Sequence, residues 1–309
     1  MTTSPAGWAT TSIPAPQPLE AGGELIWQTG AKLGEGPTWD EETASLLMVD
    51  IFAGQVHRLR PDARSVDTLT VGQPVSSVFP TASGGLALTG KDSLVAVSSD
   101  GVTVTELVRF PDVGEKERMN DAKCDPEGRL FAGSMTEIGT DSSLYRVGAD
   151  LDVEDVLEGV GISNGLAWSS DRKWMYYIDS VSGSVDRFSY DSASGEIADR
   201  SVVVRIDPGL GAPDGMCIDA EDHLWVAIFG GGIVRRYDPS GLIADEIEVP
   251  APNVTSCCFG GAGYTDLYVT TARAGLAEEE RERFPLSGSV FRFTPAVGGT
   301  APFSFAGSI

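Results

Sequence analysis

Histidine is almost absent from this chain of 309 residues, which contains only His57 and His223. Serine-histidine and cysteine-histidine nucleophile pairs need this residue, and so do histidine-rich zinc sites. The scarcity therefore severely limits the mechanisms that this chain could use.

Two glycine-rich stretches resemble known motifs without having the surroundings that those motifs need. Residues 161–165 match the Gly-x-Ser-x-Gly elbow of serine hydrolases. That elbow requires a strand-turn-helix context and a histidine partner, whereas strand-like sequence follows here, so we do not expect Ser163 to be a nucleophile. Residues 230–232 are all glycine and precede another strand-like run, which favours a tight turn between strands over a phosphate cradle.

Basic residues and long apolar runs are also scarce. The 22 lysines and arginines stand against 45 aspartates and glutamates, a formal net charge of −23. Such a field repels nucleic acids and anionic membranes and attracts cations. No stretch approaches the roughly 18 apolar residues that a membrane-spanning helix needs. Residues 1–18 contain no lysine or arginine and no apolar core, unlike a secretory signal, so we expect a cytoplasmic protein without nucleic acid or membrane partners.

Cysteine is limited to four residues that lack the paired spacing of metal sites and stand in apolar sequence, namely Cys124, Cys217, Cys257 and Cys258. This pattern predicts buried free thiols, as in a reducing compartment. Adjacent cysteines point to opposite faces of a strand, which argues against a disulfide between Cys257 and Cys258.

What the chain does contain, from about residue 24 onward, is short apolar runs separated by turns rich in glycine, aspartate and proline. This pattern predicts strands, without convincing amphipathic helices. The acidic run at residues 276–283 could form one helical turn or a solvated loop. Residues 1–22, rich in serine, threonine, alanine and proline, are predicted to be a disordered tail, and residues 23–309 a single domain.

One unit recurs six times in that domain: a turn, an apolar anchor, a glycine-containing turn and a second apolar run. Equivalent positions are Glu35, Val75, Asn120, Asn164, Asp214 and Thr255, separated by 40, 45, 44, 50 and 41 residues. A period of this length, built from short strands, is typical of a β-propeller blade. We therefore predict an all-β fold, a six-bladed β-propeller.

Rotation about the axis of a propeller would bring the equivalent positions to one central channel. Four of them carry an oxygen ligand, namely Glu35, Asn120, Asn164 and Asp214. A set of oxygen donors suits Ca²⁺, Mg²⁺ or Mn²⁺ better than Zn²⁺. Without a cation, repulsion between Glu35 and Asp214 should raise the pKa of at least one of them. Arg118 is expected to orient an anionic or polyhydroxylated substrate.

Seven stretches of the chain, at residues 34–37, 74–78, 120–121, 162–166, 176–180, 213–220 and 255–261, match one known family, and residues 301–307 extend the match toward the C-terminus. Taken together, these stretches resemble the senescence-marker-protein/gluconolactonase (regucalcin-like) family of six-bladed propellers.

The resemblance implies a sugar-lactone hydrolase with one divalent metal held by Glu35, Asn164 and Asp214, with waters completing the coordination. It also implies that Arg118 and Asn120 bind the substrate. Ca²⁺ or Zn²⁺ is the first expectation, with Mg²⁺ or Mn²⁺ as alternatives. Regucalcin-like members place an acidic substrate-contacting residue about eighteen positions after the asparagine, where this chain has Ile138 beside Glu137, so the particular sugar stays open.

We hypothesise that a metal-activated water attacks the lactone while Asp214 accepts its proton, without a covalent intermediate. The expected partner is a small sugar lactone, and the oligomeric state stays open. Two alternatives remain at this point. The same metal could serve a phosphotriesterase-type hydrolase, or the propeller could bind Ca²⁺ without catalysis.

Overall fold

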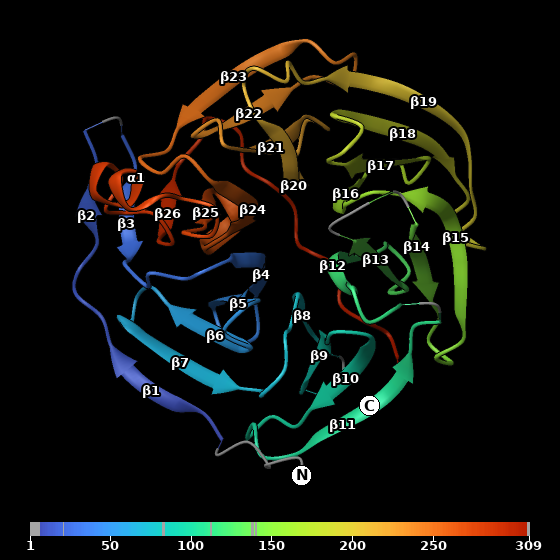
Figure 1. Cartoon of the computed structure of the whole chain (residues 1–309), viewed down its shortest axis with the longest axis horizontal. Coiled ribbons are helices and arrows are strands. Elements are labelled where there is room, and N and C mark those ends of the chain that lie inside the picture. Colours follow the sequence, from blue (N-terminus) through green and yellow to red (C-terminus); the bar gives the residue numbers. More distant parts are fainter. Residues whose placement is uncertain are drawn as a thin grey trace.

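Six antiparallel sheets stand radially around a common axis in the computed structural model (Figure 1). The structure describes residues 7–20, 22–81, 84–111, 113–136, 139 and 141–307. One strand of each sheet lies nearest the axis, and the chain then proceeds outward strand by strand. The predicted six-bladed β-propeller is confirmed.

The blades are numbered here from 1 to 6 along the chain, and each contains four strands in the same order from the axis outward. The innermost strands are β4 (Gly34–Asp40), β8 (Ser77–Pro80), β12 (Glu117–Cys124), β16 (Ser163–Trp168), β20 (Ala212–Ile218) and β24 (Val254–Gly260). The second strands are β5 (Ser45–Asp50), β9 (Leu86–Thr89), β13 (Leu130–Thr136), β17 (Trp174–Asp179), β21 (Leu224–Phe229) and β25 (Asp266–Thr271). The third strands are β6 (Gln55–Arg60), β10 (Ser93–Val97), β14 (Ser142–Val147), β18 (Ser184–Tyr190), β22 (Ile233–Tyr237) and β26 (Val290–Phe293). The fourth strands are β7 (Ser65–Thr70), β11 (Val104–Arg109), β15 (Val153–Val160), β19 (Ile197–Arg205), β23 (Ile243–Glu248) and, in blade 6, β3 (Glu24–Trp27).

Blade 6 combines strands from both ends of the chain. The N-terminal strand β3 pairs with β26, which belongs to the C-terminal part of the chain. The ring is therefore closed by backbone hydrogen bonds between segments that are more than two hundred residues apart in sequence.

The hydrophobic core consists of six separate clusters, one between each pair of neighbouring blades. Alternate side chains of a strand point to opposite faces of its sheet, so each blade contributes to two clusters. Cys257 packs between blades 5 and 6, whereas Cys258 packs between blades 6 and 1. All four cysteines are buried free thiols, as predicted.

The N-terminal segment is ordered where the structure describes it, and the prediction of a disordered tail was wrong for residues 7–20. Strand β1 (Ala9–Ser12) pairs with β7, and β2 (Gln17–Pro18) pairs with β3. The Thr10 hydroxyl donates to the Asp67 carboxylate at 2.7 Å, and the guanidinium of Arg58 lies over the Trp8 ring at 4.7 Å. An outer strand has unpaired backbone groups, which a polar extended segment can satisfy without an apolar side. Residues 1–6 lie outside the described part of the chain.

Helical structure is confined to two short segments within the described residues, the 3-10 helix η1 (Ala262–Tyr264) and the α-helix α1 (Glu278–Arg283). The acidic run therefore adopts the helical one of the two conformations left open by its sequence. Across the residues that are described, neither helix has the length and apolar character needed to cross a membrane.

After β26 the chain returns across the axis and ends between blades 2 and 3 (Figure 1). Phe305 forms a parallel bridge to Thr81, and its side chain is completely buried in the cluster between these blades. Phe303, two residues earlier, is 37% exposed. The C-terminal segment is thus anchored by a buried aromatic ring in addition to its backbone hydrogen bonds.

We predict that Phe305→Ala lowers the free energy of unfolding by about 3–5 kcal/mol, the usual cost of truncating a buried phenylalanine. Phe303→Ala, the matched control, should cost less than about 1 kcal/mol because its ring is partly exposed. Urea denaturation followed by tryptophan fluorescence measures both. Equal, small effects of the two substitutions would show that the C-terminal anchor does not stabilise the ring.

Candidate functional site

The predicted site residues lie where the inner strands break register with their neighbours. On β20, Pro213 pairs with Ile228 and the next paired residue is Met216, so Asp214 and Gly215 both stand opposite a single residue of β21. The same two-against-one break encloses Asn120-Asp121 on β12 and Asn164-Gly165 on β16. These are β-bulges, which turn a side chain out of the alternating pattern of a strand.

Blade 1 has its bulge one residue later than the other three blades. Glu35 is the last residue of β4 to pair before the break, and Gly36 and Pro37 form the bulge itself. The Glu35 carboxylate accepts a hydrogen bond from the Gly36 amide at 2.9 Å. The longer glutamate side chain therefore starts from a different backbone position than the asparagine and aspartate side chains.

Glycines at or opposite the bulges let neighbouring inner strands approach closely. A Cβ atom on Gly215 would stand 2.1 Å from the Ser256 hydroxyl oxygen, and one on Gly165 would stand 2.8 Å from the Met216 nitrogen. Both distances are too short for non-bonded atoms. In each Asn-Gly or Asp-Gly pair, the first residue thus supplies a polar side chain, and the glycine allows the inner strand of the next blade to pack closely against it.

A chain of hydrogen bonds joins blades 3, 4 and 5 at the site. The Arg118 guanidinium donates to the Asn120 side-chain oxygen at 2.7 Å, and the Asn120 amide nitrogen donates to the Asn164 side-chain oxygen at 3.1 Å. The Asn164 amide nitrogen donates in turn to the Ser180 hydroxyl at 2.8 Å, which donates to the Pro213 carbonyl at 2.6 Å. This chain fixes the orientation of both asparagine amides.

Three carboxylates are buried near the axis, at the end of the channel where the bulges lie. They belong to Glu35, Asp121 and Asp214. Burial first, and the charge of Asp121 second, raise the pKa of Glu35 to about 8. Burial also raises the pKa of Asp214 well above its usual value, and the charges of Glu35 and Asp121 add to this rise. The predicted rise in pKa is confirmed, but its first cause is loss of solvent and like charges come second.

Asp121 and Ser180 are residues that sequence reasoning passed over. Asp121 is the second residue of the bulge on β12, and its charge raises the pKa of both other carboxylates. Ser180 links Asn164 to blade 5. Both stand in stretches that carry the family resemblance. A scan for oxygen donors next to the six equivalent positions could have found Asp121, but not Ser180, which follows β17 and is sixteen residues after Asn164.

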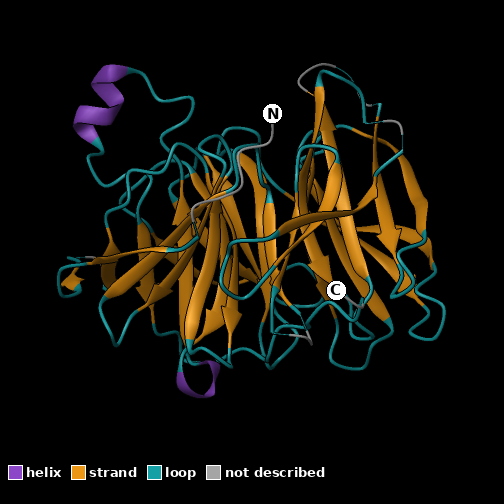
Figure 2. Cartoon of the chain, turned by 90° about the horizontal axis from the view of Figure 1, so that it is seen from below, coloured by secondary structure: helices purple, strands orange, loops and turns teal. Residues whose placement is uncertain are grey.

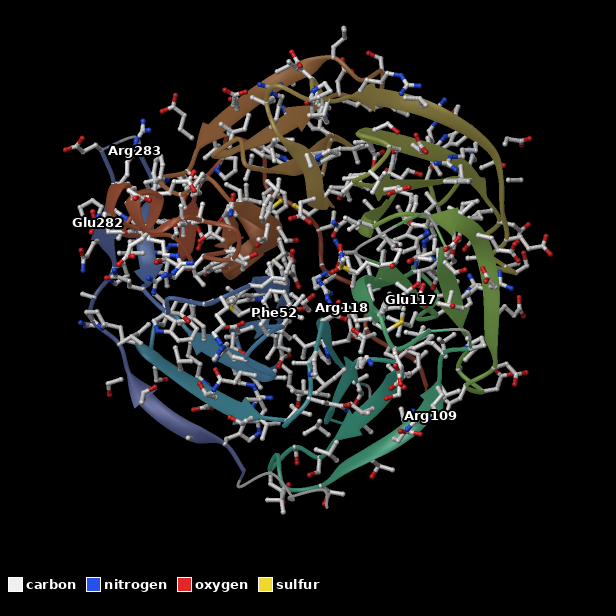
Figure 3. The ribbon with its side chains drawn as sticks, in the orientation of Figure 1. Phe52, Arg109, Glu117, Arg118, Glu282 and Arg283 are labelled. Atoms are coloured by element: carbon white, nitrogen blue, oxygen red, sulfur yellow. The ribbon has the colours of Figure 1, made fainter. Side chains whose placement is uncertain are left out.

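Phe52 is a further residue of the site that no sequence pattern marked. It lies in the turn between β5 and β6, is 52% exposed, and the Arg118 guanidinium stands 5.8 Å from its ring centre. Figure 3 shows the side chains of Phe52 and Arg118 near the centre of the propeller. An exposed aromatic ring and a cation thus form part of the rim of the channel.

The oxygen donors of Glu35, Asn164 and Asp214 fit a divalent cation. Buried carboxylates are costly unless a positive charge compensates them. The Asn164 oxygen, although it accepts one hydrogen bond, has a second lone pair. Across the described ranges, no three or more histidine, cysteine, aspartate and glutamate side chains form a group that could hold a metal, so a cation here would depend on the amide oxygen as well as on carboxylates.

The other residues and motifs considered in the sequence analysis do not belong to the group formed by Glu35, Asn164 and Asp214. Ser163 is buried within β16 and is followed by β17 rather than by a helix. His57 lies in the third strand of blade 1, where it contacts Thr68 and Trp27, and burial lowers its pKa to about 4. Residues 230–232 connect β21 and β22, as predicted. Glu137 and Ile138 lie outside the described residues.

Comparison with known proteins agrees with this architecture. Residues 33–273 match the SMP-30/Gluconolactonase/LRE-like region. Regucalcin from Xenopus laevis is 40% identical over 293 residues, which cover 92% of this chain and 98% of the relative. A regucalcin structure from Agrobacterium tumefaciens, described as a calcium-binding protein, is 24% identical with a TM-score of 0.88, covering 96% of this chain and 99% of its own. A gluconolactonase structure from Xanthomonas campestris is 20% identical with a TM-score of 0.72, and the match covers 95% of this chain and 99% of that one. The chain belongs to the SMP-30/gluconolactonase/LRE-like family.

Proposed function

We propose that this protein is a metal-dependent hydrolase that opens sugar lactones. The observation that carries the proposal is the convergence of Glu35, Asn120, Asn164 and Asp214 on one end of the axis, where buried carboxylates have raised pKa values. Membership of the family supports it, since one structural relative is described as a gluconolactonase and another as a calcium-binding protein.

We assign the cation to Glu35, Asn164 and Asp214. All of their donors are oxygen atoms, which favours Ca²⁺ as our first candidate. Zn²⁺ is kept as the second candidate on the family resemblance alone, with Mg²⁺ or Mn²⁺ as alternatives. When bound, a divalent cation supplies polarisation of the lactone carbonyl and a lower pKa for water. The positive charge also offsets the burial that raises the pKa of Asp214.

The protein's own residues then have distinct roles in this proposal. Asp214 accepts a proton as the water oxygen bonds to the carbonyl carbon. The ring carbon-oxygen bond breaks, and its oxygen takes up a proton to give the open hydroxy acid. Asn120 and Arg118 hold substrate hydroxyls and carbonyl, and their mutual hydrogen bond restricts both side chains before the substrate arrives.

Removal of the cation should abolish hydrolysis of glucono-δ-lactone, and Ca²⁺ should restore it. Asp214→Asn should lower kcat/KM by about 100-fold or more, since it removes the proton acceptor. Asp245→Asn on the exposed outer strand β23 is the matched control and should change little. A pH-indicator assay measures both.

Three outcomes would contradict the assignment. Activity that survives chelation and Asp214→Asn would remove the metal role, and a higher kcat/KM for phosphotriesters would favour the phosphotriesterase alternative. Cation binding without turnover of either substrate would favour a non-catalytic propeller.

Cation affinity should rise with pH. In the cation-free protein the pKa of Glu35 is about 8, so this group keeps a proton over a range in which the unfolded chain has lost it. Stability of the cation-free form should therefore fall as pH rises from about 5 to 8, and Ca²⁺ should reverse the fall. Calorimetry in buffers of different ionisation enthalpy should detect proton release on binding at pH 7. Affinity that is independent of pH would contradict the assignment of Glu35 as a ligand.

Phe52→Ala should raise KM about two- to fivefold with little change in kcat, because an exposed cation-aromatic contact contributes roughly 0.5–1 kcal/mol to holding Arg118. Leu242→Ala, at an exposed position on blade 5, is the control. Steady-state kinetics with glucono-δ-lactone separate the two parameters, and a loss confined to kcat would contradict this role.

A further inference from the structure

A second cavity lies at the opposite end of the channel from the site described above. It encloses about 380 Å³. Its wall includes Thr38, Cys124 and Ile218, which follow Glu35, Asn120 and Asp214 by three or four positions on the same strands. Because each strand residue advances roughly 3.3 Å, the cavity lies about 10–13 Å further along the axis.

The two ends of the channel have different chemistry. The wall of the cavity is largely apolar and comes from all six inner strands and the turns after them, with Phe79, Leu166, Trp168, Ile218 and Phe259 among its residues. The other end carries the carboxylates and amides. A volume of this size falls at the lower end of the range of pockets that hold small organic molecules.

The charged side chains that line the cavity already have partners within the protein. The Lys123 ammonium donates to the Met216 carbonyl at 2.7 Å. The Arg172 guanidinium donates to the Glu127 carboxylate at 2.7 Å. Asp219 accepts from Arg236 at 2.7 Å, and Asp222 accepts from Ser170. A charged ligand would have to displace one of these partners, so the wall favours an uncharged molecule.

Lys123 separates the cavity from the acidic end. It extends from β12 in blade 3 to the backbone of β20 in blade 5, two blades that are not adjacent in the ring, so its side chain crosses the region near the axis. Its charge also lowers the pKa of Asp121 against the effect of burial. The ammonium group therefore stabilises the charged form of the Asp121 carboxylate on one side and forms part of the wall of the apolar cavity on the other.

The C-terminal segment roofs the cavity. Residues 300–303 line it, and the chain is fastened on both sides of them. The Gly299 amide donates to the Tyr264 carbonyl at 2.8 Å, and the Ala306 amide donates to the Gly128 carbonyl at 2.9 Å. Figure 1 shows this segment crossing the centre of the ring, and Figure 2 shows the C-terminus toward the face opposite α1. Residues 300–304 are exposed to solvent on the outside.

We propose that this cavity is a second binding site, which takes a small, uncharged, predominantly apolar molecule and is separate from the site of lactone hydrolysis. The apolar wall, the internal pairing of its charged groups and the anchored roof together carry the assignment. It does not depend on the proposed function, since none of its wall residues is assigned to the metal or to the lactone.

The test is a fluorescence titration with N-phenyl-1-naphthylamine, an uncharged aromatic probe that emits strongly in apolar surroundings. The full-length protein should show saturable binding at one site, unchanged by Ca²⁺ or by excess gluconate. Ile218→Trp and Ala301→Trp, which place bulk on the wall and on the roof, should each weaken binding at least tenfold. Leu242→Trp, at a position that is 68% exposed on blade 5, should leave binding unchanged.

Activity provides the second measurement. Both wall and roof variants should keep wild-type lactone hydrolysis, and Ala301→Trp covers the case in which Ile218→Trp does not fold. Binding that fails to saturate, that Ca²⁺ or gluconate displaces, or that Leu242→Trp weakens equally would overturn the proposal.

Discussion

The pairing of β3 with β26 is the interaction on which the rest of the molecule depends. A blade has two apolar faces, and neither can be buried unless a neighbouring blade stands on that side. The six clusters between blades therefore form as a closed set, and the last gap is closed only when the N-terminal strand completes blade 6. The convergence of the candidate residues on one axis follows from that closure, because they come from blades 1, 3, 4 and 5.

Within the closed ring, bulges decide which side chains leave the core and face the axis. A regular strand would place Asn120, Asn164 and Asp214 in the gaps between blades, where a polar side chain is costly. The two-against-one breaks on β12, β16 and β20 turn them away from those gaps. The resulting concentration of carboxylates is unfavourable by itself, and it gives the acidic chain a local field that attracts cations.

The period of the repeated unit was enough to predict the six blades and the equivalent positions, because rotation about an axis converts equal spacing in sequence into proximity in space. Contacts between different blades do not follow that period. Phe52 approaches Arg118 from blade 1, and Lys123 reaches from blade 3 to blade 5, so neither role could be predicted from spacing. The added strands β1 and β2 escaped prediction for a different reason. Their residues are exposed and mostly polar, and the backbone makes their pairing, so their side-chain pattern does not indicate a strand.

Blade 6 contains strands from both the N-terminal and the C-terminal parts of the chain. No blade in the described ring can therefore separate from its neighbours without breaking strand pairing or packing between blades. The connection between blades 4 and 5, at residues 206–211, is one of several short links whose peptide bonds carry no part of the ring closure. A cut there would leave two fragments that each contribute to blade 6 and are held together across it. A break in this link would leave the ring closed, whereas deletion of β3 would open it, because the pairing of β3 with β26 and not this peptide bond closes the ring.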